Sequence, residues 1–535
     1  MSTLLDVPEV SAFFVMYDES SGAFLRARED DKSFALKDMM SCEKSNLMCQ
    51  SGLDIIFKAK EDFIVNDIDK VSEDAFGVNI YRNLRDQGIK SYIMTPLYDE
   101  GKLLGVIEFA STLNGAFNKT HVYRIDEMKG LCINAIKRAM NERENQLASI
   151  IQNEFTSIHP SVEWRFRQEA EKSIEAEVLN KDYDISKIYF QNLTALFGQM
   201  DISGSSFARN DAIAADLNEQ MDMVKSILTS VKQNVSMPLL DSILYQISII
   251  NEKLASDLAA GMEQEVIEFL RLTINPLFQE LAYRNEDYKA SISSYFNKIG
   301  EGLEVIYNKR KDYDQSVKMI NHHLASRMDK EQEAAQEIYP HFFERYKTDG
   351  VEHNMYIGQE ITPDIPYSKL YLDNLRLWQL KTMCELEIEY NNRLEKMPVP
   401  LKVASLIMVY SNPLAIRYRM GEKQFDIDGA YNARYEIIKK RIDKAYIKGT
   451  TERVTQPGKI VIIYTQPHDL DEYLNFVNYL SYQGYLKGEP ELFDIEDLQG
   501  VIGLKGLRVD VNFDYKVERD KVISHQDDLL EEVVV

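Results

Sequence analysis

Apolar residues in the first 120 positions fall into short runs that end in polar turn residues. Runs of this length, bounded by Gly, Ser, Asp or Glu, predict strands joined as hairpins, and Gly101 suits a tight turn. Because both sides of these strands are apolar, we expect helices to cover both faces of the sheet. The runs lie within Ser11–Asp18, Gly22–Asp30, Asp62–Asp69 and Lys90–Ser111.

From about His121 the apolar spacing changes to three or four positions, which predicts helix. Polar residues 141–146 interrupt the apolar stripe of the first helix, and Pro160 ends or kinks it. Further helices are predicted to about residue 346, with heptad spacing at Leu217–Val231 and a kink at Pro276. We therefore expect a helical bundle or coiled coil. The stripe of the first helix is Met128, Cys132, Ala135, Ala139, Leu147, Ile150 and Phe155.

Residues 201–211 are interpreted as a loop in which Ser205 or Ser206 caps the next helix. After Asp349-Gly350, strand-like and helix-like segments alternate again. The sequence thus predicts an α+β multidomain protein with four parts. These are a sheet with helices at 1–145, a helical connector and bundle at 146–348, an α+β domain at 349–515 and an acidic tail at 516–535.

Composition and charge narrow the classes of function. The chain is 44 % apolar and 28 % charged, with no apolar run near the roughly 20 residues that cross a bilayer. A net charge of −24 disfavours nucleic acid and anionic lipid, although Arg434–Lys448 could be an anion-binding helix face as well as a solvated one. We expect no membrane insertion and no nucleic-acid partner. Four cysteines without disulfide or zinc spacing favour the cytoplasm, namely Cys42, Cys49, Cys132 and Cys384.

The N-terminal quarter resembles a GAF domain in the order of its elements. The resemblance lies in VSAFFVMYDESSGAFLRA, FIVNDI and GIKSYIMTPLYDEGKLLGVIEFASTLNGAFNKTHVYRIDEMKGLCINAIKRA. It implies a GAF-like sheet with helices that binds a small ligand, such as a cyclic nucleotide, tetrapyrrole, haem, amino acid or oxo-acid, or binds nothing. A GAF domain usually opens with a helix, and the first strand here starts too near Met1 for one. We expect that helix to be lacking or to come from another chain.

The remaining three quarters resemble a poorly characterised group of bacterial GAF-containing proteins, and this resemblance implies no reaction. The stretches that carry it are SIHPSVEWRFRQEA, LFGQMDISGSSFARN, FDIDGAYNARYEIIKKRIDKA and TERVTQPGKIVIIYTQ.

Polar residues on or beside the strand that starts at Ser91 are the candidate lining of a ligand pocket. A pocket needs a few convergent polar groups in an apolar wall. The alternative is a filled core with solvated arginines. The candidate ligand-binding residues are Asp67, Arg82, Arg85, Ser91 and Thr95.

Signals of catalysis or metal binding are weak. Adjacent His322 and His323 diverge by about 100° on a helix and cannot easily share an ion. Cys132 occupies an apolar helix position, which favours core packing over attachment of a cofactor. His468 follows a buried strand, where α/β sites often form, but it is a single histidine. We expect no metal, no cofactor and no assigned catalytic residue.

Three hypotheses for function follow. The first is a cytoplasmic signalling protein in which the GAF-like domain senses a small molecule or partner and relays its state through helices to the C-terminal domain. The second is a non-enzymatic dimeric scaffold with an empty GAF pocket. The third is an enzyme with its site in residues 350–515. A homo-oligomer through the helix that leaves the sheet is expected, because small residues in its stripe let a second helix approach.

Overall fold

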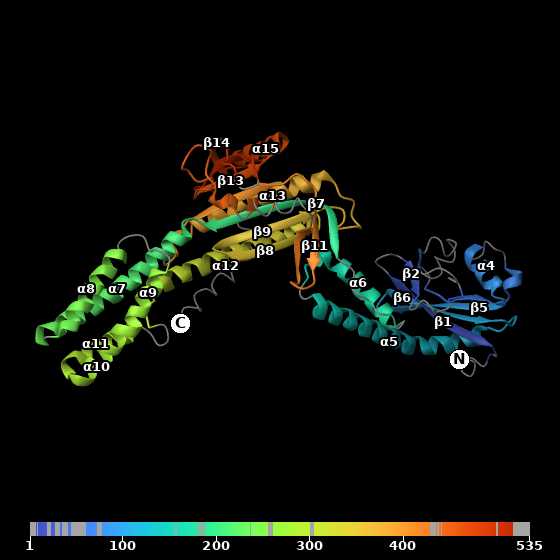
Figure 1. Cartoon of the computed structure of the whole chain (residues 1–535). Coiled ribbons are helices and arrows are strands. Elements are labelled where there is room, and N and C mark those ends of the chain that lie inside the picture. Colours follow the sequence, from blue (N-terminus) through green and yellow to red (C-terminus); the bar gives the residue numbers. More distant parts are fainter. Residues whose placement is uncertain are drawn as a thin grey trace. The chain divides into compact units, whose positions relative to one another are not determined.

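The computed structural model describes 7, 9–18, 23–26, 33–34, 41–43, 60–71, 78–155, 158–178, 181, 183, 188–235, 237–254, 261–299, 304–428, 435, 438–439, 441–498 and 501–516. The chain divides into two compact units, Met1–Asn153 and Glu154–Val535. Each unit is α+β, with the first formed by the blue elements and the teal helix α5 of Figure 1 and the second by the elements that follow α5 in the chain.

The described strands of the first unit form a six-stranded antiparallel sheet with the order β3-β2-β1-β6-β5-β4. The hairpin expected at Lys90–Ser111 is present as β5 and β6, with Tyr92 opposite Ala110 and Leu97 opposite Gly105. The strands are β1 (Val10–Asp18), β2 (Ala23–Arg26), β3 (Ser41–Glu43), β4 (Phe63–Val65), β5 (Ser91–Asp99) and β6 (Lys102–Ser111).

Helices pack on both faces of this GAF-like sheet, as the apolar pattern predicts. On one face, Leu84 of α4 (Val78–Asp86) packs with Tyr92 and Met94. On the other, Ile125 of α5 (Lys119–Ile150) packs with Ile93 and Leu97. Successive residues of β5 therefore serve opposite cores. A 3₁₀ turn, η2 (Ile68–Lys70), follows β4.

The second unit is built on a nine-stranded sheet with β7 near its middle. The long strand β7 pairs with β9 on one side and with β10 and β11 on the other. Among the described strands, β10 and β13 form the one parallel pair. The strands are β7 (Tyr189–Ile202), β8 (Phe342–Thr348), β9 (Gly350–Ile357), β10 (Val403–Val409), β11 (Leu414–Arg419), β12 (Gln424–Asp428), β13 (Lys459–Tyr464), β14 (Leu486–Asp494) and β15 (Lys505–Val511).

A helical bundle lies between β7 and β8 in the chain, shown in green to yellow-green in Figure 1. The heptad residues expected at Leu217–Val231 face its interior. Buried Asp216 accepts the backbone N–H groups of Lys309 (2.8 Å) and Arg310 (3.0 Å), which fixes the start of α12 against α7. The helices are α7 (Ser205–Asn234), α8 (Pro238–Leu254), α9 (Met262–Phe269), the π-turn η5 (Leu270–Ile274), α10 (Asn275–Arg284), α11 (Glu286–Lys298) and α12 (Lys309–Ile338).

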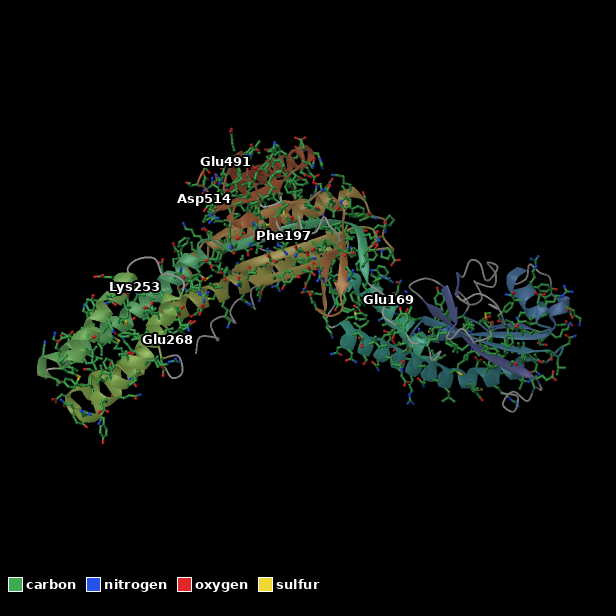
Figure 2. All side chains as sticks on the ribbon, in the orientation of Figure 1. Glu169, Phe197, Lys253, Glu268, Glu491 and Asp514 are labelled. Carbon is green, nitrogen blue, oxygen red and sulfur yellow. The ribbon has the colours of Figure 1, made fainter. Side chains whose placement is uncertain are left out.

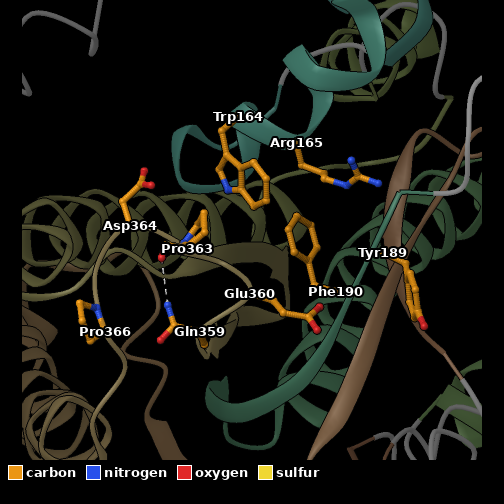
Figure 3. A pocket seen from close by; sticks show the side chains of 9 residues that line it. All are labelled: Trp164, Arg165, Tyr189, Phe190, Gln359, Glu360, Pro363, Asp364 and Pro366. Carbon is orange, nitrogen blue, oxygen red and sulfur yellow. Dashed lines mark hydrogen bonds between the residues drawn. The ribbon is translucent and has the colours of Figure 1, made fainter. Parts of the chain in front are cut away.

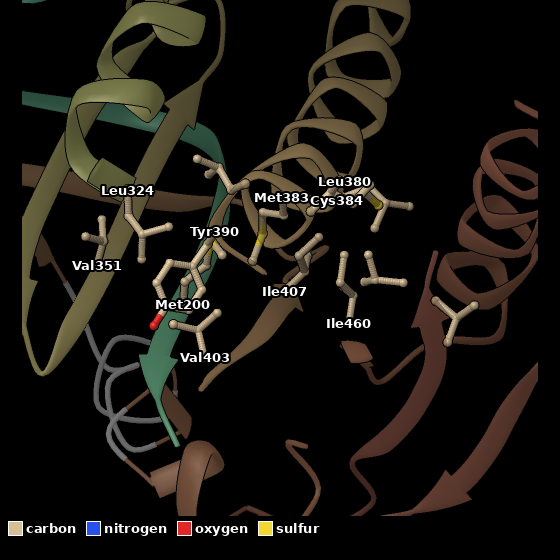
Figure 4. Close-up of a cluster of buried hydrophobic side chains, with 14 of the residues drawn as sticks. Met200, Leu324, Val351, Leu380, Met383, Cys384, Tyr390, Val403, Ile407 and Ile460 are labelled. Atoms are coloured by element: carbon tan, nitrogen blue, oxygen red, sulfur yellow. The ribbon is translucent and has the colours of Figure 1, made fainter. Parts of the chain in front are cut away.

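One face of the nine-stranded sheet carries the main core of this unit (Figure 4). Ile407 of β10 and Ile460 of β13 pack there against Cys384 of α13. Residues between Tyr313 and Met328 of α12, together with α15, complete that layer. The remaining helical elements are the π-turn η4 (Ile151–Phe155), α6 (Pro160–Val178), α13 (Lys369–Asn391), η6 (Leu394–Lys396), η7 (Ile442–Lys444) and α15 (Pro467–Gln483). No helix in the described part of the chain has the length and apolarity needed to span a membrane.

The interval 146–348 differs from the all-helical expectation, because residues 189–202 form β7 and residues 342–348 form β8. Phe197 of β7 lies within the sheet of the second unit (Figure 2). The loop expected at 201–211 is reduced to two residues, and Gly204 rather than a serine is the N-cap of α7, without a side-chain cap. The Ser205 hydroxyl instead donates to Asp349 at 2.5 Å. The four-part division stays a prediction, although β7 shares one sheet with strands after 349.

The close packing around Gly198 leads to a prediction about stability at the centre of this sheet. A Cβ atom there would lie 2.3 Å from the His353 ring and 3.0 Å from the Gln379 amide nitrogen. We expect Gly198→Ala to destabilise the second unit by about 1–3 kcal/mol, because both neighbours are buried and cannot retreat. Urea unfolding followed by circular dichroism measures the change. Gly421→Ala, where nothing lies within 4 Å, is the matched control, and equal stability of the two variants would contradict the prediction.

Candidate functional site

Three of the candidate pocket residues lie at or near the surface of the first unit. Asp67 is the N-cap of η2, where its carboxylate accepts the Asp69 N–H at 3.2 Å and pairs with Lys70 at 3.0 Å. Arg82 and Arg85 are exposed on α4. The guanidinium of Arg85 lies 6.0 Å from the ring centre of its own-helix neighbour Tyr81. The contacts described here for Asp67 and Arg85 are with residues of their own segments.

Ser91 and Thr95 are fully buried on the α5 face of the sheet. The Ser91 hydroxyl lies 2.8 Å from the Asn66 carbonyl oxygen and accepts the Ala116 N–H at 3.2 Å. Thr95 Oγ1 has no hydrogen-bond partner among the described residues. The structure therefore does not bring the five candidates together in one pocket, because two of them face α5 and Arg82 and Arg85 lie on α4. Whether any of them contacts a ligand stays a prediction.

A buried carboxylate on the α4 face is the polar centre that sequence reasoning missed. Glu108 of β6 is fully buried in the same face as Tyr92. Its Oε1 accepts the Tyr92 hydroxyl at 2.6 Å, and its Oε2 accepts the Ser33 hydroxyl at 2.9 Å and the Phe34 N–H at 3.0 Å. The signal in the sequence was one acidic residue inside the apolar strand GVIEFAS.

The Glu108 cluster ties residues 33–34 to the sheet, and Gln87 holds the same two residues. Gln87, just after α4, donates to the Phe34 carbonyl at 2.9 Å, so residues 33–34 are held from two sides. Burial and the adjacent Glu108 charge raise the pKa of Tyr92 well above its ordinary range, so Tyr92 is a neutral donor. Apolar side chains pack around it on this face. The cluster can therefore position residues 33–34 on the sheet.

The second unit has an open cleft of about 580 Å³ between α6, the start of β7 and the loop 358–368 (Figure 3). Trp164 donates its indole N–H to the Ile361 carbonyl at 2.9 Å. Its ring meets Phe190 edge to face at 6.1 Å. The lining residues are Trp164, Arg165, Tyr189, Phe190, Gln359, Glu360, Pro363, Asp364 and Pro366.

A third polar group lies where the parallel strands β10 and β13 end. Asp469, fully buried at the start of α15, accepts the Ser411 hydroxyl at 2.5 Å and lies 3.4 Å from the exposed His468 ring. The Ser411 hydroxyl and the His468 ring both contact the Asp469 carboxylate, and no contact joins the serine to the histidine among the described residues. A nucleophile–base pair would require a hydrogen bond between the serine and the histidine, so this arrangement does not match one. Among the described residues, no group of three or more His, Cys, Asp or Glu side chains could hold a metal ion.

Comparison with protein-family models finds no match, and comparison with curated proteins finds none either. Solved structures resemble about a quarter of the chain. A domain from Sinorhizobium meliloti 1021, described as part of a two-component sensor histidine kinase, is 15 % identical and covers 27 % of this chain and 88 % of its own, with a TM-score of 0.21.

Two further solved structures are GAF domains. The GAF domain region of a Geobacter sulfurreducens PCA protein is 20 % identical, covers 24 % of this chain and 81 % of its own, and has a TM-score of 0.20. A phycoerythrobilin-bound GAF domain of a cyanobacterial phytochrome is 13 % identical, covers 26 % of this chain and 82 % of its own, and has a TM-score of 0.21. These likenesses concern fold alone.

Buried titratable groups in the second unit give its stability a pH dependence. Burial raises the pKa of Glu387 from 4.5 to about 8, against the opposing hydrogen bond from Ser405 at 2.7 Å. Burial and the charges of Asp443 and Asp349 raise the pKa of Asp201 to about 7. Burial lowers the pKa of three histidines, to about 4 for His159 and His341 and about 3 for His353.

The two kinds of group act in opposite directions. A histidine whose folded pKa is lowered weakens the fold as pH falls from 6.5, because the unfolded chain binds the proton first. A carboxyl group whose folded pKa is raised weakens the fold as pH rises from its unfolded pKa to its folded pKa. Between pH 6.5 and 8 the carboxyl effect outweighs the remainder of the histidine effect among these groups, because the unfolded histidines are already at least half deprotonated.

We therefore expect the second unit to lose stability from pH 6.5 to 8, and Glu387→Gln to remove about 1–2 kcal/mol of that loss. Urea unfolding at several pH values measures the slope. The exposed Glu395→Gln is the control and should keep the wild-type slope. An unchanged slope in Glu387→Gln would show that this carboxyl group is not the cause.

Proposed function

We propose that the chain is a regulatory protein in which the GAF-like first unit senses a small molecule or a partner and passes its state through α5 to the second unit. In this proposal the GAF-like fold detects the signal, and the helix α5 transmits the resulting change. We further propose that the protein acts in the cytoplasm as a homodimer, binds a small-molecule ligand and catalyses no reaction.

The observation that carries the proposal is the course of α5. Its first half packs on the sheet through Ile125, Cys132 and Ile136, and Lys137 pairs with Asp99 of β5 at 2.6 Å. The helix then continues for thirteen further residues, from 138 to 150, and passes without a break into the π-turn η4, where the two units meet in the chain. A shift of β5 or β6 would therefore move a helix that leads directly to the second unit.

The π-turn suits a point where a helix changes state. Each π-turn inserts an extra residue into the helical hydrogen-bond pattern, and such insertions occur frequently at functional sites. Beyond Lys137, the described side chains of α5 are mostly exposed, with Leu147 a buried exception. The second half thus has few contacts that oppose a rotation or a change of partner.

A scaffold without a ligand is the second candidate function. The apolar cluster around Tyr92, which includes Val65, Leu84, Val106 and Ala110, favours it because a filled core leaves less room for a small molecule. The two functions differ in one respect: only a sensor must couple the sheet to α5.

Hydrogen exchange in the full chain tests that coupling. Glu108→Gln replaces one acceptor oxygen by an NH₂ group, which cannot accept the hydrogen bonds that this oxygen accepts now. The side-chain volume hardly changes, so the main effect is weaker hydrogen bonding on the α4 face of the sheet. We expect exchange at residues 138–150 to rise about fivefold, equivalent to about 1 kcal/mol of opening free energy. The exposed Glu61→Gln is the control. A rise confined to the sheet would favour the scaffold.

The expected dimer has its own test. Ala135 and Ala139 of the predicted stripe are exposed on α5, whereas Cys132 packs against its own sheet. Sedimentation of the full chain at tens of micromolar should show a dimer in the wild type and a monomer in Ala139→Glu, because a charge would enter the seam. Asn141→Glu adds the same charge about 200° around the helix and should leave the dimer intact. A monomeric wild type would contradict the expectation.

A further inference from the structure

The cleft of the second unit is rigid because its loop is hydrogen-bonded to itself and to several elements. Within the loop, Gln359 donates to the carbonyls of Thr362 (3.1 Å) and Pro363 (3.2 Å) and accepts the Tyr367 N–H at 2.8 Å. From outside, Trp164 of α6 holds Ile361, and Tyr339 holds Ile365 at 3.2 Å. A loop fixed in this way is preorganised for binding, since little entropy is lost when a ligand arrives.

The cleft wall is largely aromatic and prolyl. Trp164 and Phe190 meet at its centre, Pro363 lies beside the indole, and Tyr189, which is 40 % exposed, lines the strand side (Figure 3). Its volume falls within the roughly 300–1,000 Å³ of small-molecule sites. An apolar wall with a few charged groups at its edge suits a ligand that has an apolar body and a charge.

The sign of that charge follows from the ion pairs at the cleft. Arg165 lies 3.1 Å from the buried carboxylate of Glu169. Burial acts to raise the pKa of Glu169, but hydrogen bonds from Lys172 and Tyr183 and the Arg165 charge lower it overall. Glu169 is shared between Arg165 and Lys172, whose ammonium group lies 2.8 Å from the same carboxylate oxygen.

The two carboxylates that line the cleft both belong to its loop. Glu360 is fixed by the Gln191 N–H, which it accepts at 2.5 Å. Asp364 is exposed and forms no ion pair among the described residues. The lining of the cleft therefore has two carboxylates against the one guanidinium of Arg165, and it includes a tryptophan. Aromatic faces attract cations, and tryptophan does so most strongly.

We propose that this cleft binds a small organic cation of the alkylammonium class, with the alkyl groups against Trp164 and Pro363 and the positive charge near Asp364 and Glu360. The wall accommodates the apolar body, and the two carboxylates select the sign. Nothing in this proposal depends on the sensory role of the first unit.

Tryptophan fluorescence gives a direct readout, because the chain has two tryptophans, Trp164 and Trp378. The full chain with Trp378→Phe reports on Trp164 alone. The probe is tetramethylammonium chloride, with sodium chloride at equal ionic strength as the salt control and tert-butanol as the uncharged analogue of the same shape. We expect a saturable emission change with tetramethylammonium and none with the other two.

Variants of the rim decide the role of charge. Asp364→Asn in the same background should weaken binding about five- to tenfold, since cation binding then has one carboxylate fewer. The exposed Glu333→Gln on α12 removes an equal charge elsewhere and should bind as before. Calorimetric titration of the chain with both tryptophans gives a second measurement if Trp378→Phe fails to fold.

The proposal fails on any of three results. One is the absence of saturable binding at about 100 mM tetramethylammonium, far above the millimolar range expected of so weak a contact. Another is an equal response to tert-butanol, which would make the cleft merely apolar. The third is undiminished binding in Asp364→Asn.

Discussion

The second unit depends on the pairing of β7 with strands that follow it only after the whole helical bundle. β7 comes before α7, yet its partners β9 and β10 come after α12, so the sheet cannot form until the bundle has returned the chain to its starting point. Loop closure of this length costs entropy before any contact compensates. A bundle that folds locally shortens the effective loop, because its two ends emerge side by side.

Hydrogen bonds where the bundle joins the sheet hold the two ends of the bundle together. The Ile202 N–H donates to the Asp349 carbonyl at 2.8 Å, and the Ser205 hydroxyl donates to the Asp349 carboxylate. A few turns further out, Asp216 accepts amides at the start of α12 and the guanidinium of Arg310 at 3.2 Å. The apolar clusters of bundle and sheet are separate, so these polar contacts align one with the other. Buried charge here specifies position more than it adds stability.

Sequence patterns predicted the elements whose periodicity is long and missed several strands, of which β7 is central to the second unit. The hairpin of β5 and β6 and the helix α5 followed from alternation and three-to-four spacing sustained over many residues. β7 did not, because Ala195, Leu196 and Phe197 form a short apolar run between polar residues that suits a strand or a helix equally. Its partners lie far away in the sequence, and only tertiary pairing decides.

The sequence could not group the candidate site residues for a related reason: the face of a strand cannot be assigned without its neighbours. Ser91 and Thr95 were chosen as polar residues on one side of β5, and that side proved to face α5. The polar residue on the other face of the sheet is Glu108. Burying its carboxyl group costs free energy, and three hydrogen-bond donors offset that cost. An apolar side chain would fill that position at lower cost. A carboxylate that fixes residues 33–34 against the sheet is better explained by control of that segment's position than by stability, and control of position is what the proposed sensory role would require.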